Sequence, residues 1–240
     1  MRLRAAVFAF VAFALMLVGS SSAAARTNGP RLAPNHKITH STSSNWAGYA
    51  AFNGRYTSVS ASWKQPTASC TSQTTYSSFW VGLDGDGSST VEQTGTSADC
   101  SGGAPRYYAW YEMYPKFPTN LSLTVRPGDH MSGSVTTNGN GAFTLTIRNV
   151  TTGQTYTTSQ RLNHAKLASA EVIAEAPSGS GGVLPLTNFG SANFSSATVN
   201  GQSIGSFNPD RIDMVSGGVT KATTSALSGG TAFSVTWKHA

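Results

Sequence analysis

The stretch Phe143-Thr144-Leu145-Thr146-Ile147-Arg148 alternates apolar and polar side chains, and it follows the turn sequence Asn138-Gly139-Asn140-Gly141. Successive side chains of a β-strand point to opposite faces of a sheet, so this alternation predicts a strand with one buried face. Asn-Gly pairs favour tight turns because both residues readily adopt positive φ. The stretch therefore predicts a strand that begins directly after a turn.

The same pattern recurs on both sides of this stretch. Leu121, Leu123 and Val125 alternate with polar neighbours, and so do Phe233, Val235 and Trp237. Further turn signals separate the apolar runs at residues 53–54, 127–129 and 200–201. No sustained helical periodicity follows the N-terminal segment. Many short strands at this spacing predict an all-β fold, an antiparallel β-sandwich.

Composition agrees with this fold class. Charged residues make up 11% of the 240 residues, and hydrophobic residues make up 39%. Soluble proteins usually have about 25% charged residues. Thr, Ser and Gly take the place of the missing charges, which favours strands and turns over helices. A chain of this length fits a single β-sandwich domain.

The N-terminal segment has the features of a targeting signal. Arg2 and Arg4 precede an apolar run over 5–18, and small residues follow up to Ala25. This order is typical of a secretory signal peptide. The apolar run is shorter than the roughly 20 residues that span a membrane. We expect residues 1–25 to be the signal peptide, residues 26–40 a leader or short pro-segment, and residues 41–240 a single secreted, extracellular domain with no membrane partner.

The chain contains 2 cysteines, Cys70 and Cys100. Outside the cell such a pair predicts a disulfide, and the alternative is two free buried thiols. Without a cluster of Cys and His, the sequence offers no metal site and indicates no cofactor.

Net charge excludes another class of function. The formal net charge of +6 falls to +4 once Arg2 and Arg4 leave with the signal peptide. A nucleic-acid binder usually clusters its basic residues on one face. Here they are scattered singly along the sequence, so we expect no nucleic-acid partner.

The acidic residues restrict the possible acid–base chemistry. The chain lacks the Asp-Thr-Gly and Asp-Ser-Gly motifs of pepsin-type enzymes, the HExxH zinc helix and the GxSxG elbow. A serine triad stays open, because its members can be distant in sequence. The 10 acidic residues are Asp84, Asp86, Glu92, Asp99, Glu112, Asp129, Glu171, Glu175, Asp210 and Asp213.

Two predicted strands place carboxylates beside apolar or aromatic residues on one face. In Arg106–Tyr114, Glu112 shares its face with Tyr108, Trp110 and Tyr114. In Ala170–Ala176, Glu171 and Glu175 lie opposite the face that carries Ala170, Val172, Ala174 and Ala176. A concave binding face has this pattern, and so does a solvated sheet surface. Alternation alone leaves both interpretations open.

Several segments, taken in order, resemble motifs of the glutamic endopeptidases, or eqolisins. The resemblance runs from Ser43 to about Met214, which is most of the chain after the signal peptide. The segments are Ser43–Gly48, Trp80–Gly85 with the following Gln93-Thr94-Gly95, Ala109–Pro115, Ala170–Glu175 and Asn188–Ser191.

This resemblance implies both a fold and a site. The fold is a lectin-like (concanavalin A-like) jelly roll of two large antiparallel sheets. The implied catalytic residues are Gln93 and Glu175, the second glutamate of its strand. Alternation alone could not choose between Glu171 and Glu175, because both side chains point to the same face of the strand. The residues expected to bind substrate or support the site are Trp80, Asp84, Trp110, Glu112, Tyr114 and Glu171.

The implied activity is hydrolysis of peptide bonds in polypeptide substrates at acidic pH, by a secreted monomer without a cofactor. Met113 and Val172 stand where many fungal members carry Trp, so side-chain preference is expected to differ. The short leader departs from the longer fungal pro-segments. Two alternatives remain from the residues themselves: a carbohydrate-binding or glycoside-hydrolysing sandwich, because paired carboxylates and exposed aromatics also suit sugars, and a non-catalytic surface module.

Overall fold

The computed structural model describes residues 42–240, which form strands and one 3-10 helix, η1 (Ile204–Phe207). The expected signal peptide and leader, residues 1–25 and 26–40, lie outside the described residues. Within residues 42–240, no helix has the length and apolar character needed to cross a membrane.

The longer strands are β2 (Trp46–Ala51), β3 (Ser58–Lys64), β4 (Ser78–Leu83), β5 (Val91–Ser101), β6 (Ala104–Tyr114), β8 (His130–Thr137), β9 (Ala142–Asn149), β10 (Thr155–Arg161), β11 (Ala170–Glu175), β14 (Ser191–Val199), β16 (Asp210–Ser216), β17 (Val219–Thr224) and β18 (Phe233–Trp237). The short ones are β1 (Thr42–Ser43), β7 (Thr119–Asn120), β12 (Ser178–Gly179), β13 (Gly182–Val183) and β15 (Gln202–Ser203).

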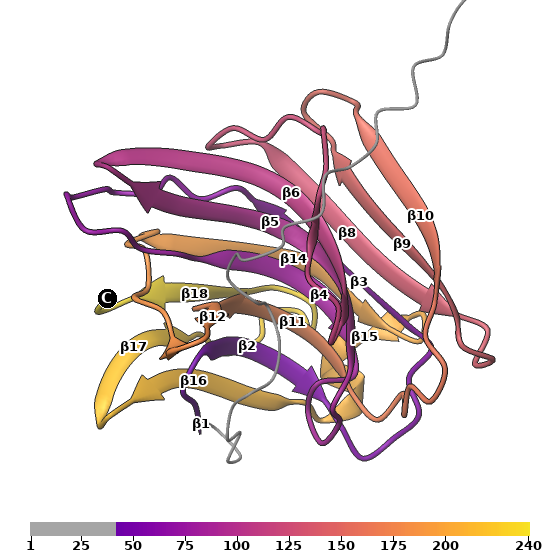
Figure 1. Cartoon of the computed structure of the whole chain (residues 1–240). Coiled ribbons are helices and arrows are strands. Elements are labelled where there is room, and N and C mark those ends of the chain that lie inside the picture. The colour runs from indigo at the N-terminus through magenta and orange to yellow at the C-terminus, as the bar shows by residue number, and fades with distance from the viewer. Residues whose placement is uncertain (1–41) are drawn as a thin grey trace, which may run out of the picture.

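The long strands form two sheets that share β16 (Figure 1). The front sheet has the order β16-β2-β11-β4-β5-β6-β7, and the back sheet has the order β10-β9-β8-β3-β14-β18-β17-β16. Residues 210–212 of β16 pair with β2, whereas residues 214–216 pair with β17. Neighbouring strands on these paths are antiparallel. The expected all-β sandwich of two large antiparallel sheets is confirmed.

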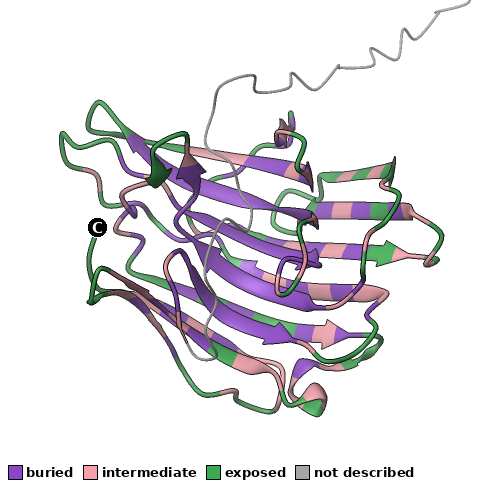
Figure 2. Ribbon diagram, turned by 60° about the horizontal axis from the view of Figure 1, so that its bottom comes forward, coloured by how far each residue is buried: buried purple, intermediate pink, exposed green. Residues whose placement is uncertain are grey.

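The hydrophobic core lies between the two sheets, and the alternation that predicted the strands also predicts their buried faces. Phe143, Leu145 and Ile147 of β9 are buried, Thr144 between the first two is exposed, and so is Arg148 directly after Ile147. In Figure 2 the central strands of the front sheet are buried, and β2, β4 and β11 are buried along their whole length.

One hydrogen bond crosses the core and fixes the two sheets relative to each other. The indole Nε1 of Trp63, on β3, donates to Thr96 Oγ1, on β5, at 2.9 Å. A buried indole N–H needs such a partner, because leaving it unpaired costs free energy. Thr96 therefore marks the face of β5 that points into the core.

One strand prediction is wrong. Leu121, Leu123 and Val125 are buried as expected, but the strand there is β7, which ends at Asn120. Leu121 N still donates to Ala109 O of β6 at 2.9 Å, but beyond it side chains bind the backbone: Gln154 Oε1 accepts from Thr124 N at 3.2 Å. Asn149 Nδ2 donates to Thr124 O at 3.0 Å. Alternation of apolar and polar residues predicts which side chains are buried, but it does not show which groups bind the backbone.

The predicted disulfide is confirmed, because Cys70 and Cys100 are bonded across a sequence separation of 30 residues. Thr75 N donates to Cys100 O at 3.1 Å, and Cys100 N donates to Thr75 O at 2.9 Å. The disulfide therefore joins the segment before β4 to the far end of β5, a strand that also carries Gln93.

Replacing both cysteines, in Cys70→Ala with Cys100→Ala, should lower the free energy of unfolding by about 3–4 kcal/mol, because a loop of this length restricts the unfolded chain. Urea denaturation of the double variant and of the wild type measures this difference. Reducing agent should destabilise the wild type and leave the double variant unchanged. Equal denaturation midpoints for the two proteins would contradict the prediction.

Candidate active site

The front sheet has a second buried cluster on the face that points away from the core, which we call the site face. Its central strands β2, β4 and β11 are buried along their whole length, so large side chains pack on both of their faces. The cluster on the site face comprises Trp46, Ala50, Trp80, Val91, Trp110, Ile173 and Ile212, with Tyr108 and Tyr114 packed against it.

Gln93 and Glu175 both lie on the site face. In β5, Thr96 points into the core, so Gln93 has the opposite orientation. In β11, Val172 and Ala174 belong to the core cluster, so Glu175 also points to the site face. Strand β4 separates β5 from β11. The two side chains therefore share one face of one sheet.

Glu175 is the last residue of β11, and two side chains hold its carboxylate. Trp80 Nε1 donates to Oε2 at 2.8 Å, and Asn45 Nδ2 donates to Oε1 at 3.1 Å. Glu175 is fully buried. A buried carboxylate is costly unless donors replace its water, and these two donors do so.

Sequence reasoning did not single out Asn45, although it lies within the Ser43–Gly48 segment. Ser43 Oγ donates to Asn45 Oδ1 at 3.1 Å, so the amide of Asn45 turns its Nδ2 toward Glu175. Strand register explains the contact: Trp46 of β2 lies opposite Glu175. Only the pairing of β2 with β11, which are distant in sequence, brings these residues together.

Glu175 stands in the interior of the sheet, because β11 pairs with β2 on one side and with β4 on the other. The proline at position 177 ends the strand directly after the site residue, because proline cannot donate to a ladder. The expected alternative, a solvated sheet surface, is wrong, since Glu112, Glu171 and Glu175 are all fully buried.

Gln93 is held by the neighbouring strand. It lies opposite Glu112 of β6, and its Nε2 donates to Glu112 Oε2 at 2.7 Å. Hydrogen bonds to a carboxylate are short and strong. This contact fixes the direction of the Gln93 amide on the site face.

The indole of Trp80 lies between the two candidate catalytic residues. Its Nε1 edge binds Glu175, and its opposite edge packs over Gly82. A Cβ at Gly82 would lie 2.9 Å from Trp80 Cζ3 and 3.0 Å from Gln93 Cβ. A Cβ at Gly95 would lie 2.6 Å from Trp80 Cβ. Gly82 makes room for the ring, and Gly95 lets β5 approach the backbone of β4 at Trp80. One indole therefore separates Glu175 from Gln93.

The remaining aromatic residues extend this surface. Trp110 Nε1 donates to Ser97 Oγ at 3.0 Å, and Ser97 Oγ shares a hydrogen bond of 3.0 Å with Ser78 Oγ. Trp46 packs edge-on against Trp80 with ring centroids 5.0 Å apart. Each ring therefore has a fixed orientation on the site face.

Asp84 supports the site from within the protein. Its carboxylate is buried and accepts the backbone N–H groups of Leu167 and Ala168, both at 2.8 Å. These bonds fix the segment that leads into β11. Asp84 thus positions the strand that carries Glu175 and makes no contact with it in the described residues.

Glu171 shares the site face but has a different environment. It is fully buried, and neither carboxyl oxygen makes a hydrogen bond of normal geometry among residues 42–240, although the Ser169 hydroxyl and the Asp86 backbone N–H favour its charged form. Burial raises the pKa of Glu171 well above its ordinary value of 4.5, and the negative charges of Asp84 and Asp86 raise it further. A high pKa favours the neutral carboxylic acid.

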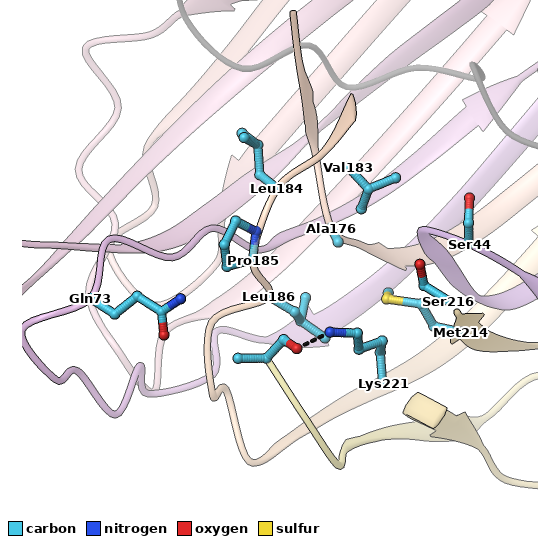
Figure 3. A pocket seen from close by; sticks show the side chains of 11 residues that line it. Ser44, Gln73, Ala176, Val183, Leu184, Pro185, Leu186, Met214, Ser216 and Lys221 are labelled. Atoms are coloured by element: carbon cyan, nitrogen blue, oxygen red, sulfur yellow. Dashed lines mark hydrogen bonds between the residues drawn. The ribbon is translucent and has the colours of Figure 1, made fainter. Parts of the chain in front are cut away.

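A pocket of about 230 Å³ adjoins the end of β11 (Figure 3). Ala176 and Ser44, which border it, are the sequence neighbours of Glu175 and Asn45. Val183, Leu184 and Leu186 form an apolar wall, and Lys221 lies at the other end. The apolar wall suits a hydrophobic side chain.

Comparison with known proteins agrees with this geometry. Residues 44–237 match the Peptidase A4 family. The chain is 29% identical over 209 residues to aspergillopepsin-2 of Aspergillus niger, which covers 76% of this chain and 74% of that protein. It is 34% identical over 135 residues to scytalidopepsin B of Scytalidium lignicola, which covers 54% of this chain and 50% of that protein.

A solved structure shows the same architecture. The crystal structure of scytalido-glutamic peptidase with a transition state analog inhibitor has a TM-score of 0.72 and 27% identity, over 81% of this chain and 98% of that one. The family match favours the peptidase interpretation over the carbohydrate-binding one. It covers every residue of the site from Asn45 to Glu175. The chain therefore belongs to the peptidase A4 family of glutamic peptidases and is a glutamic-type endopeptidase.

Proposed function

We propose that Glu175 and Gln93 form the catalytic dyad of this endopeptidase, and that the secreted enzyme hydrolyses polypeptides at acidic pH. The observation that carries the proposal is the arrangement around Trp80. A carboxylate held by two N–H donors and an amide held by a carboxylate lie on either side of one indole ring.

Glu175 is the general base. A carboxylate within hydrogen-bond reach of water removes a proton as the water attacks the peptide carbonyl carbon, and such catalysis contributes about 10²–10⁴-fold. The proton then passes to the amide nitrogen as the C–N bond breaks. Trp80 and Asn45 keep the carboxylate oriented during both transfers.

Gln93 stabilises the oxyanion that forms on the carbonyl oxygen. A glutamine amide carries two N–H donors. Glu112 accepts from Nε2 and thereby fixes the amide, and we assign the second N–H to the oxyanion. Because the Gln93 amide is neutral, it does not compete with Glu175 for a proton, as a second carboxylate would.

The environment of the two glutamates of β11 supports the choice of Glu175. A general base must be ionised, and the two N–H donors at Glu175 stabilise a carboxylate. Glu171 has no hydrogen bond of normal geometry at either carboxyl oxygen among the described residues, and its raised pKa keeps it neutral in acid. We assign Glu171 a supporting role, beside Asp84.

Trp80, Trp110 and Tyr114 supply the apolar surface against which we propose an extended peptide binds. The related scytalido-glutamic peptidase binds a transition state analog inhibitor. The pocket beside Ala176 is the place we propose for one apolar side chain of that peptide.

We also propose that residues 1–25 are removed as a signal peptide and residues 26–40 as a short pro-segment. The first described residues already belong to the site. Ser43 holds Asn45, and Asn45 holds Glu175. A boundary at residue 41 leaves this network complete.

Glu175→Gln should lower kcat by about 10²–10⁴-fold, because the amide cannot take a proton from water. Gln93→Ala should lower it by about 10²–10³-fold through loss of an oxyanion donor. Digestion of an acid-denatured protein measures both, with pepstatin present to exclude an aspartic peptidase. Glu171→Gln is the matched control and should retain far more activity than Glu175→Gln. Equal losses in the two glutamate variants would contradict the assignment.

Asn45→Leu keeps a similar volume and removes the Nδ2 donor. A hydrogen bond to a charged group contributes about 1.5–3 kcal/mol, so kcat should fall by about 10- to 100-fold. KM should change little, because Asn45 orients Glu175 and need not touch the peptide. Asn45→Asp should lose more activity, because it adds a negative charge beside Glu175. An unchanged kcat in Asn45→Leu would remove Asn45 from the site.

The exported protein should begin near residue 41 when it is active. Expression of the full chain in a secreting host, followed by intact-mass measurement of the medium, gives this N-terminus directly. A protein that starts at residue 26 should appear as a precursor and be converted in acid. Undiminished peptidase activity of a chain that retains residues 26–40 would contradict the pro-segment.

A further inference from the structure

Glu92 immediately precedes Gln93, so its side chain points to the opposite face of β5, into the core. It is fully buried and lies opposite Leu83 of β4 and Met113 of β6. Neither carboxyl oxygen makes a hydrogen bond of normal geometry in the part of the chain that the structure describes, although the Thr90 hydroxyl and the backbone N–H of Glu92 favour the charged form. This acidic residue takes no part in the chemistry derived above.

The surroundings of Glu92 offer it no compensating positive charge. Asp84, at the end of β4, is the charged residue whose field acts on it among residues 42–240, and Asp84 is itself acidic. The carboxylate of Asp84 is already engaged by the backbone of Leu167 and Ala168. Charging Glu92 would therefore place two negative charges near each other in the core.

The other elements packed against β5 confirm this picture. Strands β8 and β9 lie across the core from β5, and their titratable residues His130 and Arg148 are exposed. On β6, Tyr111 is half-buried and stacks on Tyr156. Lys166 directs its ammonium to the carbonyl oxygen of Gly87 at 3.3 Å.

We propose that Glu92 is a pH-sensitive switch that confines the folded enzyme to acid: the start of β5 packs into the core when Glu92 carries its proton, and it loosens when Glu92 ionises. The Thr90 hydroxyl and the backbone N–H of Glu92 favour the carboxylate, but burial and the charge of Asp84 outweigh them. Because Gln93 is the next residue, loosening of this segment also moves the amide that we assign to the oxyanion.

The direction of the effect follows from proton binding. Burial raises the pKa of Glu92 from its ordinary value of 4.5 to about 8, and the charge of Asp84 contributes to the rise. Between pH 4.5 and about 8, Glu92 therefore keeps its proton in the folded state and has lost it in the unfolded state. Below pH 4.5 the stabilisation is fully present. Above it, each pH unit shifts the folding equilibrium roughly tenfold toward the unfolded state, until both states are ionised near pH 8.

Glu171 should add to this dependence from the site face, because burial raises its pKa as well. The two residues lie on opposite faces of the front sheet. Their contributions can be separated by replacing each alone. The proposal about Glu92 stands on its burial and does not rest on the catalytic role of Gln93 or Glu175.

The test is the pH dependence of unfolding in Glu92→Gln, which keeps the shape of the protonated acid and cannot ionise. Urea unfolding, followed by tryptophan fluorescence, gives the unfolding equilibrium constant from pH 4.5 to 8. The slope of its logarithm against pH should fall by about one proton relative to the wild type. At pH 8 the variant should be more stable than the wild type by a factor of at least ten in that constant.

Asp129→Asn is the matched control, because it makes the same kind of change in a carboxylate that is hydrogen-bonded to Asn149 and Arg126 in the back sheet. It should change stability without reducing the slope. If the amide of Glu92→Gln prevents folding, Glu92→Leu gives the same measurement without a buried polar group. A slope in the Glu92 variants equal to that of the wild type would overturn the proposal. Because the measurement is of unfolding, failure of the peptidase assignment would leave it unaffected.

Discussion

The hydrogen bond from Trp80 Nε1 to Glu175 Oε2, at 2.8 Å, is the contact on which the site depends. It requires β4 to lie beside β11, and it requires Gly82 to leave room for the indole. A buried carboxylate without donors would cost several kcal/mol or take up a proton. The architecture of the front sheet therefore gives the two glutamates on β11 different surroundings. Two side-chain N–H groups hold Glu175, whereas neither carboxyl oxygen of Glu171 makes a hydrogen bond of normal geometry among the described residues.

Strand β5 carries a candidate catalytic residue on one face and a buried acidic residue on the other. Gln93 faces the cluster of aromatic residues and is held by Glu112. Glu92, its neighbour, faces the core, and neither of its carboxyl oxygens makes a hydrogen bond of normal geometry in the described part of the chain. The orientations of Gln93 and Glu92 are linked, because consecutive side chains of a strand point to opposite faces. A one-residue shift in the register of β5 would turn Gln93 into the core and Glu92 out of it. A charge at Glu92 therefore acts on the backbone that positions Gln93, although the two side chains do not touch.

Part of this could be predicted from the sequence, because local patterns report local constraints. Alternation in β9 and β11 predicted both the strands and their core faces, and the two cysteines predicted the disulfide. Leu121–Val125 looked like a strand, since burial alternates there, but distant side chains bind its backbone. Glu92, Thr94 and Thr96 are polar residues on the core face of β5, so the hydrophobic pattern that predicts burial is missing there. Asn45 belongs to the site only through the register of β2 with β11. The choice of Gln93 and Glu175 came from family resemblance, because the local spacing of residues does not show which distant strands lie side by side.

The proposal that the enzyme works in acid agrees with two features of the front sheet. Burial raises the pKa of Glu92 and of Glu171, so acid favours both as neutral groups. Glu175, by contrast, has two side-chain N–H donors that stabilise a carboxylate. The carboxyl groups that only pack in the sheet and the one that we propose reacts therefore have opposite surroundings. At neutral pH, Glu92 and Glu171 would gain negative charge inside the protein, where burial disfavours it. Under the proposal made here for Glu92, unfolding therefore limits the enzyme at higher pH, whatever the pH dependence of the catalytic step.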